Sequence, residues 1–191
     1  MLECGLNQCL DSVKAMCRDS LAKLVRKENI PLNSVIVKSL LWTWHKVHYV
    51  LIVLPLDKTV DIKKLAIYLQ LSGPRHVRLA STELVYSVTG QKVGNVSPIG
   101  HKQTIRTIID SSFIQDNNLN TICYGGAGDE QHELAISIQE LLRFSHIEVT
   151  DISTSANTTV TNTTAAKFNT EYFIAKEDVT IDPSLGNLLS A

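Results

Sequence analysis

The 191-residue sequence contains few of the features that mark metal-binding or disulfide-rich proteins. It has four cysteines, and none of them lie at the spacing of paired metal ligands. The six histidines show no close pairing at helical spacing. We therefore expect no metal, no other cofactor, and reduced, mostly buried thiols in a cytoplasmic protein.

Long apolar runs and an excess of positive charge are also missing. The longest apolar run, residues 49–56, is far too short to span a bilayer, and the N-terminus lacks the basic-then-apolar pattern of a signal peptide. The formal net charge is −1, which argues against non-specific binding to DNA or RNA but is compatible with a local basic groove. We expect neither a membrane nor DNA as a partner.

The pattern of apolar residues predicts one domain over residues 1–152. Helices are expected at 10–26, 61–71, 81–86 and 138–144, with Asp61, Ser81 and Ser137 as N-caps. Strands are expected at 34–41, 49–54, 76–79, 105–110, 120–125, 132–136 and 147–152. Many short strands between short helices indicate a mixed α/β (α+β) domain, and the strands lie too close together for a doubly wound fold. Residues 153–191 are rich in Ser, Thr and Asn, which predicts a mostly disordered tail.

The segment from Thr89 to Gly100 holds three glycines and one proline in twelve residues. Such a loop can present main-chain N–H groups to an ester or phosphate, although most glycine-rich segments are only turns. A serine nucleophile at Ser97 is disfavoured, because its flanking glycines are too far apart and Pro98 removes a donor. A dinucleotide site at Gly126–Gly128 is disfavoured because a third glycine is missing and two acidic residues follow.

Lys38 lies inside the apolar strand predicted at residues 34–41. A lysine in such a strand is costly unless its amine reaches water, an anion or a carboxylate. It is either part of an anion site or an ordinary lysine on the solvent face of an edge strand.

In this order the motifs resemble the YbaK family, the editing domains associated with prolyl-tRNA synthetase. The resemblance covers about residues 21–152 and rests on a series of short motifs. These are Val37-Lys38-Ser39-Leu40, Val53-Leu54-Pro55, the helix opening at Asp61, Arg78-Leu79-Ala80-Ser81, Thr89-Gly90, Gly94-x-x-x-Pro98, Ile109-Asp110, Gly126-Ala127-Gly128 and Ile136-Ser137. The resemblance implies a small α/β domain with a mixed, barrel-like sheet flanked by short helices. It implies a deacylase that hydrolyses the ester of mischarged proline tRNA, carrying alanine or cysteine, with prolyl-tRNA synthetase as a second expected partner.

The resemblance also implies the site. Lys38 is expected to bind the phosphate of the terminal nucleotide, and Gly94 and Gly128 to contribute to catalysis through the backbone of their loops. His132 occupies the position where alanine-editing prolyl-tRNA synthetase domains have a histidine that helps to select the amino acid, which favours alanine over cysteine as the substrate. The remaining residues expected to bind substrate are Ser39, Pro98, Gly100, Asp110 and Ala127.

The sequence departs from the family pattern in ways that leave other interpretations open. Family members usually carry a pocket-forming segment before the first helix, and we expect that segment to be shortened here. Asp129-Glu130 replaces residues that are often basic, which is compatible with a non-catalytic module that binds tRNA or a synthetase. A hydrolase acting on another small ester is a third interpretation. Seven cations are either an RNA-facing surface or ordinary solvated charges: Lys58, Lys63, Lys64, Arg75, Arg78, Lys92 and Lys102.

Overall fold

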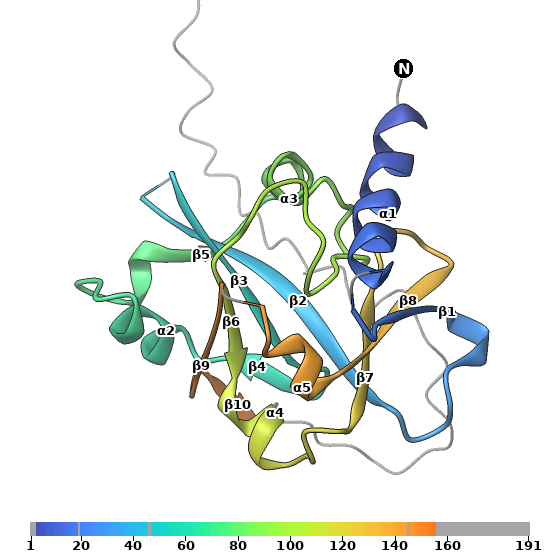
Figure 1. Cartoon of the computed structure of the whole chain (residues 1–191). Helices are drawn as coiled ribbons and strands as arrows, with labels where there is room; N and C mark the ends of the chain where they lie inside the picture. Colours follow the sequence, from blue (N-terminus) through green and yellow to red (C-terminus); the bar gives the residue numbers. More distant parts are fainter. Residues whose placement is uncertain (1–2, 19, 46, 145, 156–191) are drawn as a thin grey trace, which may run out of the picture. The chain divides into compact units, whose positions relative to one another are not determined.

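The computed structural model describes residues 3–18, 20–45, 47–144 and 146–155 (Figure 1). The helices of this part are α1 (Glu3–Arg18), α2 (Ile62–Tyr68), α3 (Thr82–Thr89), α4 (Ser111–Gln115) and α5 (Ile138–Leu141), with 3₁₀ turns η1 (Lys27–Asn29) and η2 (Pro74–His76). The strands are β1 (Lys23–Arg26), β2 (Val35–Trp44), β3 (His48–Pro55), β4 (Lys58–Val60), β5 (Val77–Leu79), β6 (Thr107–Asp110), β7 (Ile122–Gly126), β8 (His132–Ser137), β9 (Ile147–Thr150) and β10 (Ser153–Ser155).

A mixed sheet runs through the domain in the order β1-β8-β7-β2-β3-β6-β9, with β5 paired to β2. The pairs β1–β8, β7–β8, β2–β3 and β2–β5 are antiparallel, whereas β2–β7, β3–β6 and β6–β9 are parallel. Strands β4 and β10 form a separate antiparallel pair. The predicted mixed α/β class is confirmed.

The long hairpin of β2 and β3 divides the core into two clusters. Alternate residues of a strand point to opposite faces, so Val37 and Leu41 join one cluster while Trp42 joins the other. The first cluster contains residues of β6, β7, β8 and the glycine loop, and the second contains residues of α2 and β5. The two faces of β2 therefore serve different parts of the domain.

The prediction of one helix over residues 10–26 is wrong in its second half. Helix α1 ends at Arg18, and Lys23–Arg26 forms β1 instead. The reason is tertiary, because Lys23 to Arg26 pair residue by residue with Ala135 to His132 of β8. A strand partner more than a hundred residues away overrides the local helical spacing.

The three predicted helix caps are confirmed. The Asp61 carboxylate accepts from the amides of Lys63 and Lys64, and the Ser81 and Ser137 hydroxyls accept from those of Leu84 and Glu140. Besides β1, the strands and α-helices that the sequence did not predict are β4, α4 and β10, which are three to five residues long. No helix among the described residues combines the length and apolar character needed to cross a membrane.

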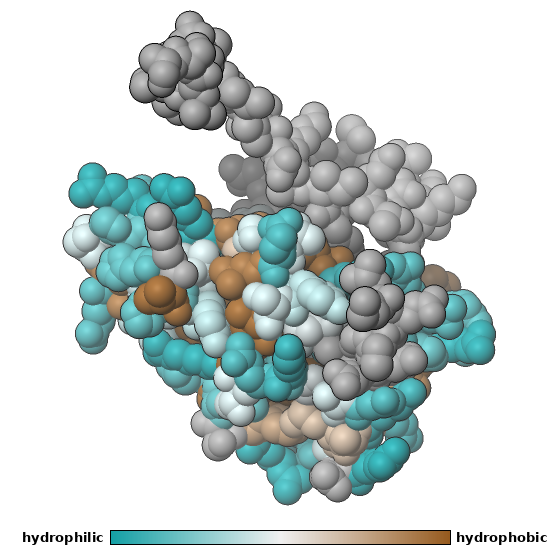
Figure 2. Space-filling view, turned by 90° about the horizontal axis from the view of Figure 1, so that it is seen from above, coloured by the Kyte–Doolittle hydropathy of each residue, from teal (hydrophilic) through white to brown (hydrophobic). Residues whose placement is uncertain are grey.

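The segment predicted as a tail is described only at its start. Ser153–Ser155 pairs with β4, whereas the predicted boundary assigns these three residues to the tail. Residues 156–191 lie outside the described residues. Figure 2 shows one face of the molecule, where hydrophobic side chains gather in the centre and hydrophilic side chains border them.

Candidate functional site

The glycine loop and the turn after β7 interlock through their backbones. The Gly128 amide donates to the Asn95 carbonyl oxygen at 2.8 Å. A Cβ atom on Gly126 would lie 2.5 Å from the Asn95 carbonyl carbon, so no side chain fits between the two segments. Gly94 and Gly128 both have φ of +92°, a conformation that glycine adopts at little cost. The structure therefore brings the segment of Gly94 and the turn of Gly128 together.

Pro98 places the same loop beside β2. A Cβ atom on Gly125 would lie 3.0 Å from Val37 Cγ2 and 3.5 Å from Pro98 Cδ. Strand β7 pairs with β2 only at Val35–Ile36, and β5 pairs with it only from Trp42 onward. Within the described part of the chain, residues 37–41 of β2 therefore have no strand partner on the edge opposite β3, next to Pro98.

The buried Gln91 and the half-buried His101 hold the loop with their side chains. Gln91 Oε1 accepts from the Ser97 amide at 2.7 Å, and His101 Nε2 lies 2.7 Å from the Ser97 carbonyl oxygen. Burial lowers the pKa of His101 to about 4, with partial opposition from the Ser97 carbonyl, so the ring is neutral and donates through Nε2. Ser97 itself is fully buried, and its two backbone groups are occupied.

Three buried side-chain atoms have no hydrogen-bond partner within the part of the chain that is described: Ser39 Oγ, Trp42 Nε1 and Gln91 Nε2. By strand alternation Ser39 points to the same face of β2 as Val37, which is the face of the glycine loop. Gln91 Nε2 lies 3.3 Å from the position of a Cβ on Gly128. A buried polar group without a partner is costly, and such groups are frequent where a ligand or water binds.

Lys38 points to the opposite face of β2 from Ser39. Its ammonium donates to the Leu56 carbonyl oxygen at 2.9 Å, and no hydrogen bond between described residues joins it to the glycine loop. Burial lowers the pKa of Lys38, and the nearby Asp57 carboxylate partly opposes this. Lys38 therefore lies on the face of β2 that is turned away from the glycine loop.

A carboxylate orients His132. Asp129 accepts from His132 Nδ1 at 2.8 Å and from the amides of Gln131 and His132 at 2.7 Å each. Burial alone would raise the pKa of Asp129, but these bonds outweigh it and lower the pKa. Asp129 therefore fixes the turn before β8 and the orientation of the His132 ring, a role that the sequence did not indicate.

Lys27 connects three segments next to the loop. Its ammonium donates to Asn95 Oδ1 at 3.2 Å and pairs with Glu133 Oε1 at 3.4 Å. Burial raises the pKa of Glu133, which Lys27 partly opposes. These contacts tie η1 and β8 to the glycine loop.

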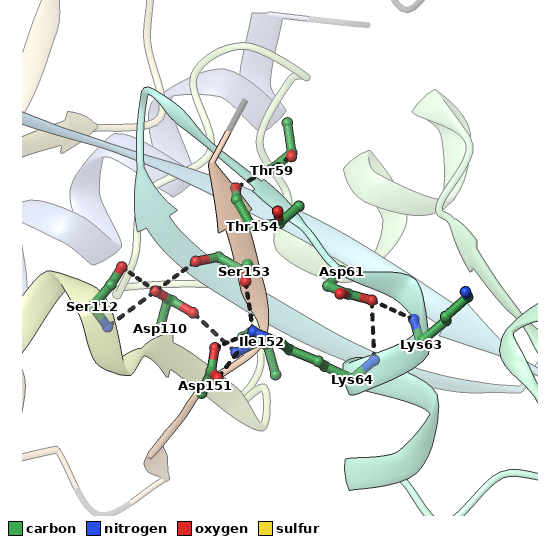
Figure 3. A network of polar contacts seen from close by, with 10 residues as sticks. All are labelled: Thr59, Asp61, Lys63, Lys64, Asp110, Ser112, Asp151, Ile152, Ser153 and Thr154. Carbon is green, nitrogen blue, oxygen red and sulfur yellow. Dashed lines mark hydrogen bonds and ion pairs between the residues drawn. The ribbon is translucent and has the colours of Figure 1, made fainter. Parts of the chain in front are cut away.

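Asp110 forms a separate polar network, seen in Figure 3. Its carboxylate accepts from the Ser112 amide and hydroxyl, from the Ile152 amide at 3.0 Å and from Ser153 Oγ at 2.9 Å. These bonds cap α4 and hold the start of β10, so the contacts of Asp110 are structural. Gly100 likewise packs against α1, where an added Cβ would lie 2.9 Å from Val13 Cγ2.

Ala127 is fully buried in the first core cluster, between the two glycines of its turn. The described residues contain no group of three His, Cys, Asp or Glu side chains that could hold a metal ion. A pocket of about 360 Å³ lies elsewhere, and no predicted site residue lines it. Its lining is Met16, Ser20, Glu140, Arg143 and Phe144.

Sequence reasoning missed the side chains that position the loop. Gln91 and Asn95 stand inside the glycine-rich segment, and a polar residue in a buried loop could have drawn attention to them. His101 follows the loop directly. Nothing in the sequence indicates Lys27 or Glu133, because their contacts exist only in the folded chain.

Comparison with known proteins identifies one family and solved structures that share the fold. The model of the aminoacyl-tRNA editing domain matches residues 17–144. The crystal structure of the hypothetical protein APE2540 superposes with a TM-score of 0.63 at 24% identity, over 75% of this chain and 99% of that one. The crystal structure of a candidate trans-editing enzyme for prolyl-tRNA synthetase superposes with a TM-score of 0.62 at 19% identity, over 81% of this chain and 100% of that one. At these identities the structures establish the shared fold.

Proposed function

Because this chain belongs to the aminoacyl-tRNA editing domain family, we propose that it is a free-standing deacylase of mischarged proline tRNA, with alanine as the favoured amino acid and cysteine as the second. In the proposed reaction water attacks the ester carbonyl carbon. The bond from that carbon to the ribose oxygen breaks, which releases the free amino acid and tRNA with its terminal hydroxyl. The observation that carries the proposal is the interlock of the Gly94–Pro98 loop with the Gly126–Gly128 turn.

The interlocked loop supports a site built from backbone donors. The bonds of this segment use the amides of Asn95, Ser97 and Ile99, which leaves those of Gly94 and Val96 without an acceptor among the described residues. Donors fixed in advance stabilise the negative charge that develops on the ester oxygen, and one such donor contributes roughly a 100- to 1000-fold rate factor. The buried Ser39 hydroxyl is a further polar group on this face.

We assign the binding of the terminal phosphate to Lys38. One of its three N–H groups bonds the Leu56 carbonyl, so two remain for an anion. In this proposal His132, oriented by Asp129, lies toward the amino-acid side and helps to exclude residues larger than alanine. Exclusion of the larger, correct proline is the logic of an editing sieve.

Deacylation of alanyl-, cysteinyl- and seryl-tRNA specific for proline tests the proposal. We expect hydrolysis of the alanyl ester and a loss of at least tenfold in kcat/KM in the Lys38→Ala variant. Lys23→Ala, an exposed lysine of β1, is the matched control and should behave like the wild type. The proposal fails if no substrate is hydrolysed, or if Lys38→Ala is as active as the control.

A second candidate is a non-catalytic module that binds tRNA or prolyl-tRNA synthetase. The observation that favours it is that no hydrogen bond between described residues joins Lys38 to the glycine loop. Tight binding of tRNA or of the synthetase without hydrolysis of any ester would support this module and exclude the deacylase.

A further inference from the structure

The tip of the β2–β3 hairpin and the neighbouring η2–β5 segment form a surface without negative charge. No Asp or Glu occurs between Glu28 and Asp57 or between Asp61 and Glu83, although the whole chain has a net charge of −1. In Figure 1 the hairpin projects past the rest of the sheet, and β5 lies beside it. We call this surface the hairpin patch, and its members are Trp44, His45, His48, Arg75, His76 and Arg78.

Aromatic rings gather on the hairpin patch. The Trp44 and His48 rings stack, with centroids 5.4 Å apart and an interplanar angle of 23°. His45 makes edge-on contacts with His48 at 6.4 Å and with His76 at 5.8 Å. His45 and His48 are exposed and Trp44 is half-buried, so solvent-facing ring area is available to a ligand.

Two exposed guanidinium groups belong to the segment beside these rings. Arg75 Nε lies 3.5 Å from His76 Nε2. Arg78 is paired in register with Thr43 of β2, so it lies on the other face of the hairpin from Trp44. Neither arginine forms an ion pair with another described residue. Cations that no carboxylate neutralises, placed beside exposed rings, match the phosphates and bases of RNA.

The patch also lies in line with Lys38. Trp44 and Lys38 are six residues apart on β2, which puts them on the same face, about 20 Å apart at roughly 3.3 Å per residue. About six stacked bases at ~3.4 Å each cover this distance. Leu40 and Trp42 lie between them on this face and are packed in the second core cluster. An RNA strand with its terminal phosphate at Lys38 therefore has the length to reach the patch over the outside of the elements that cover this face of β2.

We propose that the hairpin patch binds the RNA strand that leads to the aminoacylated end of the tRNA. The proposal rests on the function proposed above. It adds a second surface that binds the tRNA, at a distance from the ester that is hydrolysed. Trp44 and the histidines stack on bases, and Arg75 and Arg78 bind phosphates.

The test compares two charge-reversed double variants of the full chain, both checked for folding by circular dichroism. Arg75→Glu/Arg78→Glu removes the patch cations, and Lys14→Glu/Lys23→Glu changes exposed lysines of α1 and β1 by the same charge. With deacylated proline tRNA as the probe, we expect a loss of affinity of at least 30-fold for the first and under threefold for the second. The slope of log affinity against log salt should flatten by about 0.7–0.9 for each phosphate that the variant no longer binds. Hydrolysis of an alanylated CCA trinucleotide, which is too short to reach the patch, should not change.

Trp44 provides an independent measurement. Trp44→Ala should weaken tRNA binding roughly tenfold, whereas Trp44→Phe, which keeps an aromatic ring, should stay within threefold of the wild type. Intrinsic tryptophan fluorescence should be quenched by tRNA in the wild type and less so in Trp44→Phe.

The outcomes separate this surface from the proposed activity. If the wild type hydrolyses alanyl-tRNA and the patch variants bind tRNA as tightly as the control, the patch is wrong and the deacylase stands. If the wild type binds tRNA but hydrolyses no ester, and the patch variants bind tRNA more weakly than the control, the patch stands and the deacylase fails. A wild type that does not bind tRNA contradicts both.

Discussion

The Gly128 amide donates a 2.8 Å hydrogen bond to the Asn95 carbonyl oxygen, and this bond joins two segments that are 33 positions apart. Gly126 lies at the same contact, where only a hydrogen atom fits. The pairing explains why both segments are rich in glycine. Each approaches the other with its backbone, and each keeps a residue in a left-handed conformation.

Gly126→Ala should therefore destabilise the domain. The new Cβ would lie 2.5 Å from the backbone of Asn95, which cannot move aside as a flexible side chain can. Overpacking of this kind costs about 1–3 kcal/mol. For a domain of this size we expect Tm to fall by roughly 2–12 °C in differential scanning calorimetry.

Gly73→Ala is the matched control for this substitution. Nothing lies within 4 Å of a Cβ at Gly73, and its φ of 167° is extended backbone that alanine adopts. Its Tm should equal or slightly exceed that of the wild type. Equal values for the two alanine variants would contradict the interlocked geometry.

Helix caps could be predicted from the sequence, whereas the pairing of distant strands could not. Asp61, Ser81 and Ser137 were predicted as caps because a cap is a bond between residues two or three positions apart. Strand β1 was not predicted, because its helical spacing is overridden by pairing with β8. Local chemistry is visible in one sequence, but long-range pairing is not.

The same distinction holds for the site. The two glycine-rich segments could be recognised in the sequence, and the structure brings the segment of Gly94 and Pro98 against the turn of Gly128. Lys27 was not identified, since its partners Asn95 and Glu133 are 68 and 106 positions away. The role of Asp110 was also hidden, because two of its donors come from residues 152 and 153.

Asp110→Asn should reduce stability more than it reduces catalysis. The amide nitrogen of Asn has to replace either Oδ1, which accepts from Ser112 and Ser153, or Oδ2, which accepts from the Ile152 amide. Either orientation leaves a donor unpaired at a cost of about 1–3 kcal/mol. Urea denaturation at pH 7 measures this loss. Asp116→Asn, at an exposed position just after α4, should be neutral.

The pH dependence of the Asp110 variant adds a second check. Burial alone would raise the pKa of Asp110, but bonds from Ser112, Ile152 and Ser153 outweigh it and lower the pKa. The stability that the carboxylate provides is therefore complete above its unfolded pKa of about 3.9 and disappears as the pH falls through the lower folded value. The wild type and Asp110→Asn should become more alike below pH 4. A rise in KM for alanyl-tRNA with unchanged stability would instead place Asp110 in the substrate site.

Lys27→Met should destabilise the domain at neutral pH and less so in acid. The variant leaves the Glu133 carboxylate, only 14% exposed, without its cation. Removal of one partner of such a pair costs about 1–3 kcal/mol. Since burial raises the folded pKa of Glu133, stability is greatest below the unfolded pKa of about 4.3 and is lost as the pH rises through the folded value.

A double-mutant cycle isolates the Lys27–Glu133 pair. Lys27→Met/Glu133→Gln should recover most of the stability lost in Lys27→Met at pH 7, because no buried charge remains. Urea denaturation at pH 4.5 and pH 7 provides the four free energies of unfolding at each pH. A double variant as unstable as the sum of the single variants would show that the pair does not interact.

His101→Gln should remove a pH dependence of stability between pH 6.5 and pH 4. Burial lowers the pKa of His101 to about 4, so the folded state resists protonation while the unfolded chain accepts a proton near pH 6.5. The stability that neutral His101 provides is complete above pH 6.5 and falls by about 2–3 kcal/mol as the pH drops to 4.

Glutamine keeps an N–H group that can reach the Ser97 carbonyl, but it cannot take up a proton. The free energy of unfolding of His101→Gln should therefore change less with pH than that of the wild type, whereas His45→Gln, an exposed change on the hairpin, should retain the wild-type slope. Because the same imidazole bonds the Ser97 carbonyl, the wild-type loop should open more readily in acid. The protection factors of its amides against hydrogen exchange, over residues 94–100, should therefore fall between pH 6 and pH 4. Parallel slopes in the wild type and His101→Gln would contradict a buried, neutral His101.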